Sequence, residues 1–220
     1  EHFRYYESIT ESLAQHIDLD PWLITPWFDQ CPAVNFMQKQ GQQCLMARAD
    51  ALLKRVARKY KEYKIEQPPF LVIKADQGTY GMAVMMIKDV KELEALNRKQ
   101  RTRMSTLKGG APVTRAIIQE GVYSFETVEP EEAVAEPVVY MIGRHVAGGF
   151  YRVHEGRGSD ENLNAPGMNF KPLAFVEPCQ RRSADSKECV NRFYLYGVVS
   201  RLAALAAARE MSAFKQGVSK

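Results

Sequence analysis

The chain has 220 residues, of which 45% are hydrophobic and 25% charged, and its formal net charge is +4. This composition is typical of a globular domain. The slight excess of basic residues suits a protein that handles anionic ligands, but both signs of charge are scattered along the chain, so we expect no nucleic-acid partner. No run of about 20 apolar residues is present, so we expect no membrane span and no membrane partner.

The cysteines indicate the compartment. Cys31, Cys44, Cys179 and Cys189 form no CxxC pair and no histidine cluster accompanies them, so a zinc site is not expected. We expect a cytoplasmic protein, with a bridge between Cys179 and Cys189 in an oxidising compartment as the lesser alternative. The sequence begins without a methionine and inside a predicted helix, so a fragment of a longer chain is one interpretation that stays open.

Hydrophobic periodicity predicts a mixture of helices and antiparallel strands. The predicted helices cover about residues 1–20, 45–60, 89–98 and 191–211, and the predicted strands about 70–73, 83–87, 113–119, 138–142 and 146–154. The first two strands are expected to form one hairpin and the last two another, which turns at Gly143 and Arg144. Prolines indicate loop structure over 21–40. The pattern favours an α+β fold with mostly antiparallel sheets.

A lysine and two glycines stand at the tip of the first predicted hairpin. Lys74 ends a strand, and Gly78 and Gly81 follow within the loop. Glycines let backbone N–H groups approach a phosphate closely, and a lysine adds a cation, so this loop is a candidate phosphate site. It lacks the GK[ST] ending of a P-loop. An ordinary hairpin whose glycines only permit positive φ is the alternative.

The strand around Ile117 ends in Gln119, Glu120, Gly121 and Val122. Such a segment can offer main-chain amide and carbonyl groups to the edge of an adenine, with apolar side chains against the faces of the ring. A plain strand end is the alternative.

An arginine and an asparagine-rich loop form the third candidate. Arg152, on a predicted strand, could stabilise charge on a transferring phosphoryl group. Asp160, Asn162 and Asn164 follow, and in an extended segment their side chains point the same way. Hard oxygen donors of this kind suit Mg²⁺, although a solvated turn is equally compatible. Glu136, at the head of another predicted strand, is a further metal or orienting candidate, or simply an exposed acid.

The order of these motifs resembles that of ATP-grasp enzymes over about residues 45–175. The stretches KADQGTYGMAV, IIQEGVYSFE, EPVVYMI, GGFYRVH and DENLNAPG are similar to proteobacterial glutamate–cysteine ligases of the ATP-grasp-like type. The resemblance implies an ATP-grasp-like fold of two small α+β subdomains. It also implies that ATP and Mg²⁺ support ligation of the glutamate side-chain carboxylate to the cysteine amine through an acyl phosphate, the first step of glutathione biosynthesis.

The resemblance further implies a role for each motif residue. Lys74 and Arg152 match catalytic residues. The residues expected to contact ATP are Lys74, Gly78, Thr79, Tyr80, Gly81, Gln119, Glu120 and Val122. The residues expected to hold Mg²⁺ are Glu136, Asp160, Glu161, Asn162 and Asn164. Two departures stand out: Ala83 occupies a position where such loops often carry a further glycine, and the metal loop has no clean E-x-N.

The same resemblance predicts three regions. They are a partial N-terminal and linker region with helices (1–67), a small subdomain with the glycine loop (68–118), and a catalytic subdomain with the C-terminal helix (119–220). Glutamate and cysteine are the expected small-molecule substrates, and a homo-oligomer is possible. The alternatives are another ATP-grasp carboxylate–amine ligase, such as a glutathione-synthetase-like or peptide-ligating enzyme, and a non-catalytic nucleotide-binding module.

Overall fold

The computed structural model describes residues 2–77, 81–128, 132–172 and 192–218. Its contacts divide the chain into two compact units. The first unit consists of Glu1–Thr25, Glu126–Glu155 and Gly167–Lys220, and the second of Pro26–Phe125 and Gly156–Pro166. Each unit contains one four-stranded antiparallel sheet, which confirms the predicted α+β class.

The units interleave along the chain, because the segment between two strands of the first unit packs with the second. The predicted boundaries at 67 and 118 therefore do not coincide with the units. Within the described ranges, we find no helix with the length and apolar character that crossing a bilayer requires.

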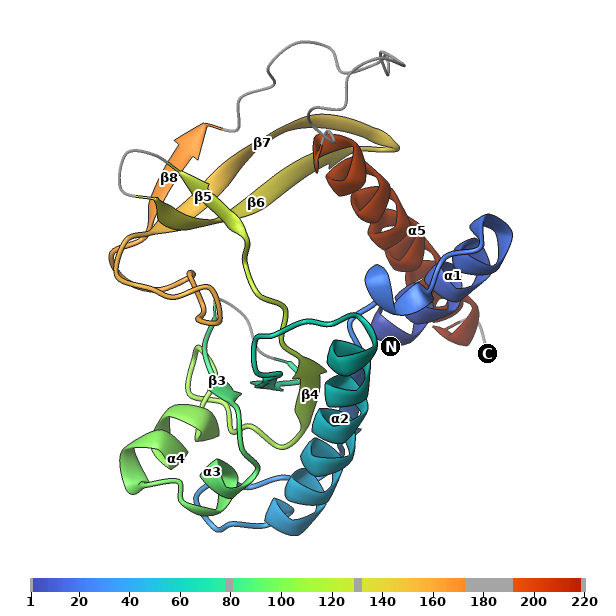
Figure 1. The fold of residues 1–220 in the computed structure, drawn as a ribbon. Helices are drawn as coiled ribbons and strands as arrows, with labels where there is room; N and C mark the ends of the chain where they lie inside the picture. The colour runs from blue at the N-terminus through green and yellow to red at the C-terminus, as the bar shows by residue number, and fades with distance from the viewer. Residues whose placement is uncertain (1, 78–80, 129–131, 173–191, 219–220) are drawn as a thin grey trace. The chain divides into compact units, whose positions relative to one another are not determined.

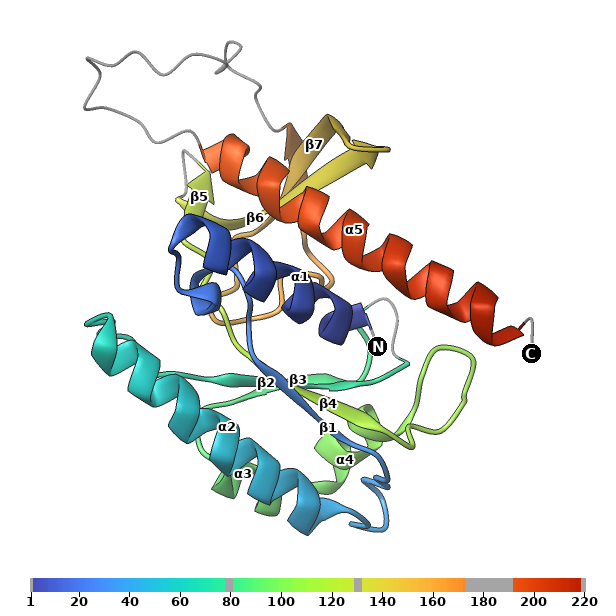
Figure 2. The ribbon, with the colours of Figure 1, turned by 90° about the vertical axis from the view of Figure 1, so that its right-hand side faces the viewer.

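The second unit is built on a sheet with the strand order β1-β4-β2-β3. Its strands are β1 (Phe28–Cys31), β2 (Leu71–Ala75), β3 (Val84–Ile87) and β4 (Ala116–Glu120), and its helices are α2 (Gln42–Glu62), α3 (Lys91–Glu94) and α4 (Arg98–Ser105). Helix α2 lies along one face of this sheet (Figure 2). The predicted amphipathic helix is thereby confirmed, and its buried residues are Leu45, Ala49, Leu52, Val56 and Tyr60.

The alternation of side chains along β2 separates the two faces of this sheet. Leu71 and Ile73 are fully buried, and Ile73 is the register partner of Ile118, on the side that α2 covers. Val72 and Lys74 point to the opposite side and are only partly buried. We call this side, with Val72, Lys74, Ile117 and Gln119, the Lys74 face.

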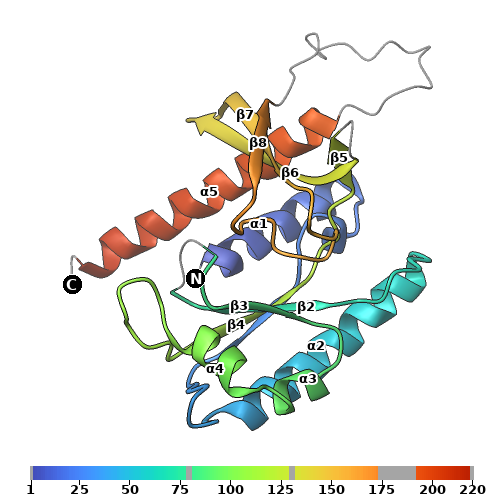
Figure 3. The same cartoon turned by 90° about the vertical axis from the view of Figure 1, so that its left-hand side faces the viewer.

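The first unit is built on a sheet with the strand order β5-β6-β7-β8. Its elements are α1 (His2–Ile17), the 3-10 helix η1 (Pro21–Leu23), β5 (Glu126–Val128), β6 (Ala133–Ile142), β7 (His145–His154), β8 (Asn169–Pro172) and α5 (Arg192–Val218). Strands β6 and β7 form the predicted hairpin. Helix α5 packs against β6 and α1 (Figures 1 and 3).

This sheet also has two unlike faces. Ala133, Ala135 and Val153 form a buried cluster on one of them. Helix α5 covers the same side, since the hydroxyl of Tyr196 donates to Glu126, the register partner of Ala135. The other face carries the predicted site residues Glu136 and Arg152, and we call it the Arg152 face.

Three elements differ from the sequence prediction. Strand β1 lies within the segment 21–40 that we expected to be loop, because its four residues are stabilised by pairing with β4 rather than by their own β-propensity. Only Lys91–Glu94 (α3) is helical within the charged helix predicted over 89–98 before the chain reaches a second helix, α4, at Arg98. The N-cap of α4 is Asn97, whose side chain accepts from Gln100 N in a capping box.

Strand β6 is longer than predicted because it runs through Pro137. The proline is the register partner of Tyr151 in β7. On the opposite edge of β6, β5 pairs only with Ala133–Ala135. Pro137, which has no N–H to donate, therefore lies outside the part of β6 that pairs with β5. Glu136 therefore lies inside a strand, not at its head.

Candidate functional site

The amine of Lys74 is held on the Lys74 face by a neighbouring strand. Its Nζ donates to Oε1 of Gln119 at 2.6 Å. The two residues project from adjacent strands, since Val72 of β2 is the register partner of Gln119. Burial lowers the pKa of Lys74, which means that the surroundings disfavour the ammonium form. The sheet thus presents an oriented, partly desolvated cation.

The glycine loop is described only at its ends. Gly78, Thr79 and Tyr80 lie outside the described residues. Gly81 has φ +71°, and a Cβ added there would lie 3.1 Å from Nδ2 of Asn164 and 3.3 Å from Nδ2 of Asn162. The structure therefore brings one end of the glycine loop against the asparagine loop, two motifs that are far apart in the sequence.

Ala83 shows why a glycine is favoured at its position. It is buried and has φ +50°, in the left-handed region that residues with a Cβ rarely adopt. Its carbonyl accepts from Ala75 N at 3.1 Å, which holds the unusual conformation in place. The departure from the family pattern that we noted in the sequence is thus a strained alanine.

The asparagine loop is not extended. Residues 156–166 form turns and bends, and Asn164 N donates to Oδ1 of Asn162 at 3.0 Å. The interpretation that the side chains point the same way along an extended segment is therefore wrong. Leu163, which is fully buried, anchors the loop, so the polar residues on either side of it are presented by a turn.

Both acids of this loop are paired with cations of the second unit. Asp160 Oδ2 lies 2.5 Å from Nζ of Lys88, and this hydrogen bond lowers the pKa of Asp160. Glu161 accepts from Gly158 N and from Nη1 of Arg157, both at 2.8 Å, and these bonds lower the pKa of Glu161. Both carboxylates are thereby stabilised in the charged form.

The Arg152 face contains one ion pair between neighbouring strands. Glu136 and Arg152 are register partners in β6 and β7, and Oε2 lies 3.3 Å from Nη1. Burial raises the pKa of Glu136, while the charge and hydrogen bond of Arg152 oppose the rise. Nε of Arg152 is buried without a hydrogen-bond partner among the described residues. Such an orphaned donor suits an acceptor supplied by a ligand.

An aromatic cluster beside this pair was not predicted. The ring centroids of Phe150 and Phe170 are 5.0 Å apart, and those of Tyr140 and Phe150 are 5.8 Å apart. Phe150 lies two residues before Arg152, so its ring lies on the Arg152 face. The spacing of Phe150 and Arg152 could have indicated that they share a face. The cluster itself was not predictable from this spacing, because its other rings come from other strands.

The predicted adenine segment is divided by the fold. Gln119 and Glu120 belong to β4, whose main chain pairs with β1 and β2 on its two sides. The Glu120 carboxylate is buried and accepts from Trp27 N at 3.0 Å. Val122, beyond the strand, is 62% exposed. The main-chain groups of Gln119 and Glu120 are therefore engaged within the sheet. The main chain from Val122 onward is better placed to face the edge of an adenine.

Gly121 is needed where this segment leaves the strand. A Cβ added to it would lie 2.1 Å from a ring carbon of Phe70, and its N–H donates to Phe70 O at 2.9 Å. The close approach of the two backbones excludes any side chain at this position.

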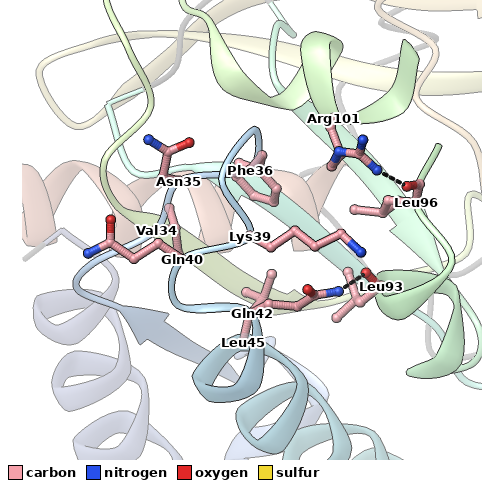
Figure 4. A pocket seen from close by; sticks show the side chains of 10 residues that line it. All are labelled: Val34, Asn35, Phe36, Lys39, Gln40, Gln42, Leu45, Leu93, Leu96 and Arg101. Carbon is pink, nitrogen blue, oxygen red and sulfur yellow. Dashed lines mark hydrogen bonds between the residues drawn. The ribbon is translucent and has the colours of Figure 1, made fainter. Parts of the chain in front are cut away.

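A separate pocket lies in the second unit (Figure 4). It has an open volume of about 330 Å³ and contains none of the predicted site residues. Its lining residues are Val34, Asn35, Phe36, Lys39, Gln40, Gln42, Leu45, Leu93, Leu96 and Arg101. Gln42 Nε2 donates to Leu93 O at 2.8 Å, and Arg101 Nη1 donates to Leu96 O at 2.5 Å, which fixes two walls of the pocket.

The acids do not form a metal centre by themselves. Among the residues that the structure describes, no group of three or more His, Cys, Asp or Glu side chains could hold a metal ion. The amide oxygens of Asn162 and Asn164 and the nearby Asp160 are nevertheless hard donors. This set fits Mg²⁺, which is commonly bound through one or two carboxylates together with the phosphates of a substrate.

Comparison with known proteins identifies the family. The model of the glutamate-cysteine ligase family (GshA) matches residues 1–211. The chain is similar to the crystal structure of a "putative gamma-glutamylcysteine synthetase" from Methylobacillus flagellatus KT, with 49% sequence identity and a TM-score of 0.83. The match covers 97% of this chain and 50% of that chain, so this chain spans about half the length of the relative. Curated proteins gave no match. The chain belongs to the glutamate-cysteine ligase family.

Proposed function

We propose that this chain is the ATP-binding part of an enzyme that joins the side-chain carboxylate of glutamate to the amine of cysteine. Membership of the glutamate-cysteine ligase family supports the reaction. The observation that carries the ATP-binding role is the amine of Lys74, which Gln119 holds at 2.6 Å on the sheet face opposite α2. Gln119 is a neutral acceptor, so this hydrogen bond orients the ammonium without placing a negative charge beside it.

The reaction divides into two steps. The glutamate carboxylate attacks the γ-phosphorus of ATP, ADP leaves, and an acyl phosphate is formed. The amine of cysteine then attacks the acyl carbon, loses a proton, and displaces inorganic phosphate. Neither step needs a protein nucleophile, so the side chains mainly position the reactants and neutralise charge.

Lys74 and Arg152 are the proposed neutralising cations. Lys74 is partly desolvated, and its charge therefore acts on a phosphate more strongly than it would in water. In Arg152, Nη1 is engaged by Glu136 and Nε is the buried donor without a described partner. A transferring phosphoryl oxygen is an acceptor of the kind that this Nε requires.

The asparagine loop is the proposed place for Mg²⁺. Asn162, Asn164 and one of the acids Asp160 and Glu161 would hold the ion. When bound, Mg²⁺ supplies charge neutralisation on the phosphates. The contact of this loop with Gly81 supports the idea that the glycine loop and the metal loop respond to the same ligand.

Val122 is the proposed adenine contact. The apolar side chain of Val122 is exposed directly beyond β4, as a contact with a base requires. Gly78, Thr79, Tyr80 and Gly81 remain the proposed cover of the phosphates, because glycine-containing tips can close over a ligand.

A cytoplasmic location completes the proposal. Cys31 and Cys44 are both free thiols, which suits a reducing compartment. Glutamate, cysteine and ATP are the proposed substrates.

Titration of the chain with ATP in the presence and absence of Mg²⁺ tests the proposal. We expect Mg²⁺-dependent binding, weakened by about 10- to 100-fold in Lys74→Ala because a charge-assisted contact is lost. Lys99→Ala, at an exposed position on α4, is the matched control and should bind as the wild type does. Equal binding by both variants would contradict the role of Lys74.

Product analysis tests the substrates. Sustained ADP release over many turnovers should require glutamate and cysteine together, and other amino-acid pairs should not replace them. Turnover with a different pair would indicate another carboxylate–amine ligase, and Mg²⁺-independent ATP binding without hydrolysis would indicate a non-catalytic module.

A further inference from the structure

Two free thiols meet where β1 ends and α2 begins. Cys31 is the last residue of β1 and is 1% exposed, and Cys44 is the third residue of α2 and is partly exposed. The Sγ of Cys31 lies 3.8 Å from the carbonyl oxygen of Gly41, the residue before α2. The buried thiol therefore lies beneath the first turn of the helix that carries the other thiol.

A neighbouring ion pair fixes the spacing between this strand and this helix. Nη1 of Arg48 lies 2.5 Å from Oδ1 of Asp29. Asp29 precedes Cys31 by two residues and lies on the same side of the strand, about 7 Å away along it. Arg48 follows Cys44 by four residues and lies on the same side of the helix, about 6 Å away along it. The ion pair and the thiol pair thus lie next to each other between β1 and α2, and each thiol shifts the pKa of the other.

The two thiols differ in reactivity. The hydrogen bond from Cys31 and then the hydrogen bond and charge of Arg48 lower the pKa of Cys44. Cys44 also lies in the first turn of α2, where the positive end of the helix dipole favours a thiolate. Burial, together with the hydrogen bond and charge of Cys44, raises the pKa of Cys31 to about 12. Cys44 is therefore the more readily ionised and the more accessible of the two thiols, and Cys31 is the buried and less readily ionised one.

We propose that Cys31 and Cys44 are a redox modification site, at which a hydroperoxide converts the two thiols into a reversible disulfide. A low-pKa, accessible cysteine beside a second cysteine is the arrangement that peroxide oxidation selects. The proposal is independent of the ligase reaction, because neither cysteine belongs to the proposed ATP site.

The reaction balances over two steps. The Cys44 thiolate attacks one oxygen of the peroxide, the O–O bond breaks, and the released hydroxide or alkoxide takes up a proton. Cys44 is then a neutral sulfenic acid, and its charge no longer opposes the ionisation of Cys31. Cys31 attacks the sulfur of Cys44, its proton passes to the departing hydroxide, and water leaves. The two thiols lose two electrons, and the peroxide gains them.

The disulfide would restrict the loop between β1 and α2, which lines part of the pocket described above. It would close the segment 31–44, which includes the bridge between Asn35 and Gln40 and several lining residues of the pocket in Figure 4. A covalent link that closes a loop of this size restricts the unfolded chain and stabilises the folded one. Oxidation is therefore expected to raise the melting temperature by about 3–8 °C, and reduction should reverse the change.

The test uses a chain in which Cys179 and Cys189 are replaced by serine, so that only the pair remains. Treatment with hydrogen peroxide should remove both free thiols, lower the intact mass by two hydrogen atoms, and join the peptides that contain Cys31 and Cys44. Dithiothreitol should restore both thiols. Retention of two free thiols, or independent addition of oxygen to each cysteine, would overturn the proposal.

Three further variants of this chain separate the two roles. Cys44→Ser should not react at the same peroxide concentration, and Cys31→Ala should stop at a sulfenic acid that dimedone traps on Cys44. Arg48→Gln should slow the first step by about 3- to 10-fold, since it removes a group that favours the thiolate. Circular dichroism shows whether each variant is folded. If folded Cys31→Ala and Cys44→Ser react alike, the assignment of the roles fails.

Discussion

In each of the two sheets, one cationic side chain contacts a side chain of the neighbouring strand. The partner is a neutral amide in one sheet and a carboxylate in the other. In the second unit, Lys74 donates to the neutral amide of Gln119. In the first unit, Arg152 is paired with the carboxylate of Glu136. An amide orients a cation and leaves its charge available, whereas a carboxylate cancels most of it. The bond to Gln119 thus orients the lysine through a neutral group, whereas the ion pair with Glu136 holds the arginine beside a carboxylate.

Replacement of each cation by methionine is expected to have the largest effect and tests the comparison most directly. Lys74→Met and Arg152→Met should each lower the rate of ADP formation with glutamate and cysteine by about 100- to 1000-fold, because each removes charge stabilisation from phosphoryl transfer. Stability should change in opposite directions. Lys74→Met removes an ammonium that burial disfavours and should leave the melting temperature unchanged or raise it.

Arg152→Met should instead lower the free energy of unfolding by about 1–3 kcal/mol, since the partly buried Glu136 then lacks its cation. Thermal and urea unfolding of both variants measure the difference. A fall in stability of the same size in both would show that the two pairs are equivalent, against the comparison.

A smaller effect is expected when the amide partner of Lys74 is replaced by a carboxylate. Gln119→Glu gives Lys74 a carboxylate partner like that of Arg152, and we expect ATP to bind about 10-fold more weakly because the charge is partly cancelled. Calorimetric titration with ATP measures the effect. Gln119→Leu is the companion variant, since it removes the acceptor without adding charge. Tighter ATP binding by Gln119→Glu would refute the role of the neutral partner.

The pH dependence of stability probes the pair in the first unit. Burial raises the pKa of Glu136 above 4.5, so the stability associated with this carboxyl is fully present below pH 4.5 and is lost as the pH rises through the folded-state pKa. Glu136→Gln cannot ionise and should not show this loss. Unfolding free energies measured at successive pH values should therefore differ between variant and wild type by an amount that grows across this window. A difference that stays constant would rule out the effect.

The exposed pair of Lys88 and Asp160 should give the smallest effect. The hydrogen bond from Lys88 lowers the pKa of Asp160 below 3.8, so its contribution is present above pH 3.8 and lost as the pH falls through the folded-state pKa. Because half of the Lys88 side chain is exposed, solvent screens the pair, and Asp160→Asn should lower the free energy of unfolding only slightly near neutral pH.

Acid unfolding of Asp160→Asn beside Asp50→Asn measures this contribution. Asp50 forms an exposed pair with Lys54 on α2 and serves as the control. A larger loss in Asp50→Asn than in Asp160→Asn would show that the asparagine loop is not held by Lys88.

The local sequence determined the elements whose stability is local. Helix α2 followed from apolar residues at helical spacing, and the hairpin of β6 and β7 followed from apolar strands around a Gly143–Arg144 turn. The positions of Lys74 and Gly81 at a strand end and a loop followed in the same way. In each case the signal and its cause lie within a few residues of one another.

Only the tertiary structure decided which of these residues meet. Lys74 reaches Gln119 across 45 positions of sequence, and Gly81 lies against Asn162 and Asn164 because a loop between two strands of one unit packs with the other. Strand β1 exists through its pairing with β4. Such pairings depend on register and burial, to which residues distant in the chain contribute, so no local pattern determines them.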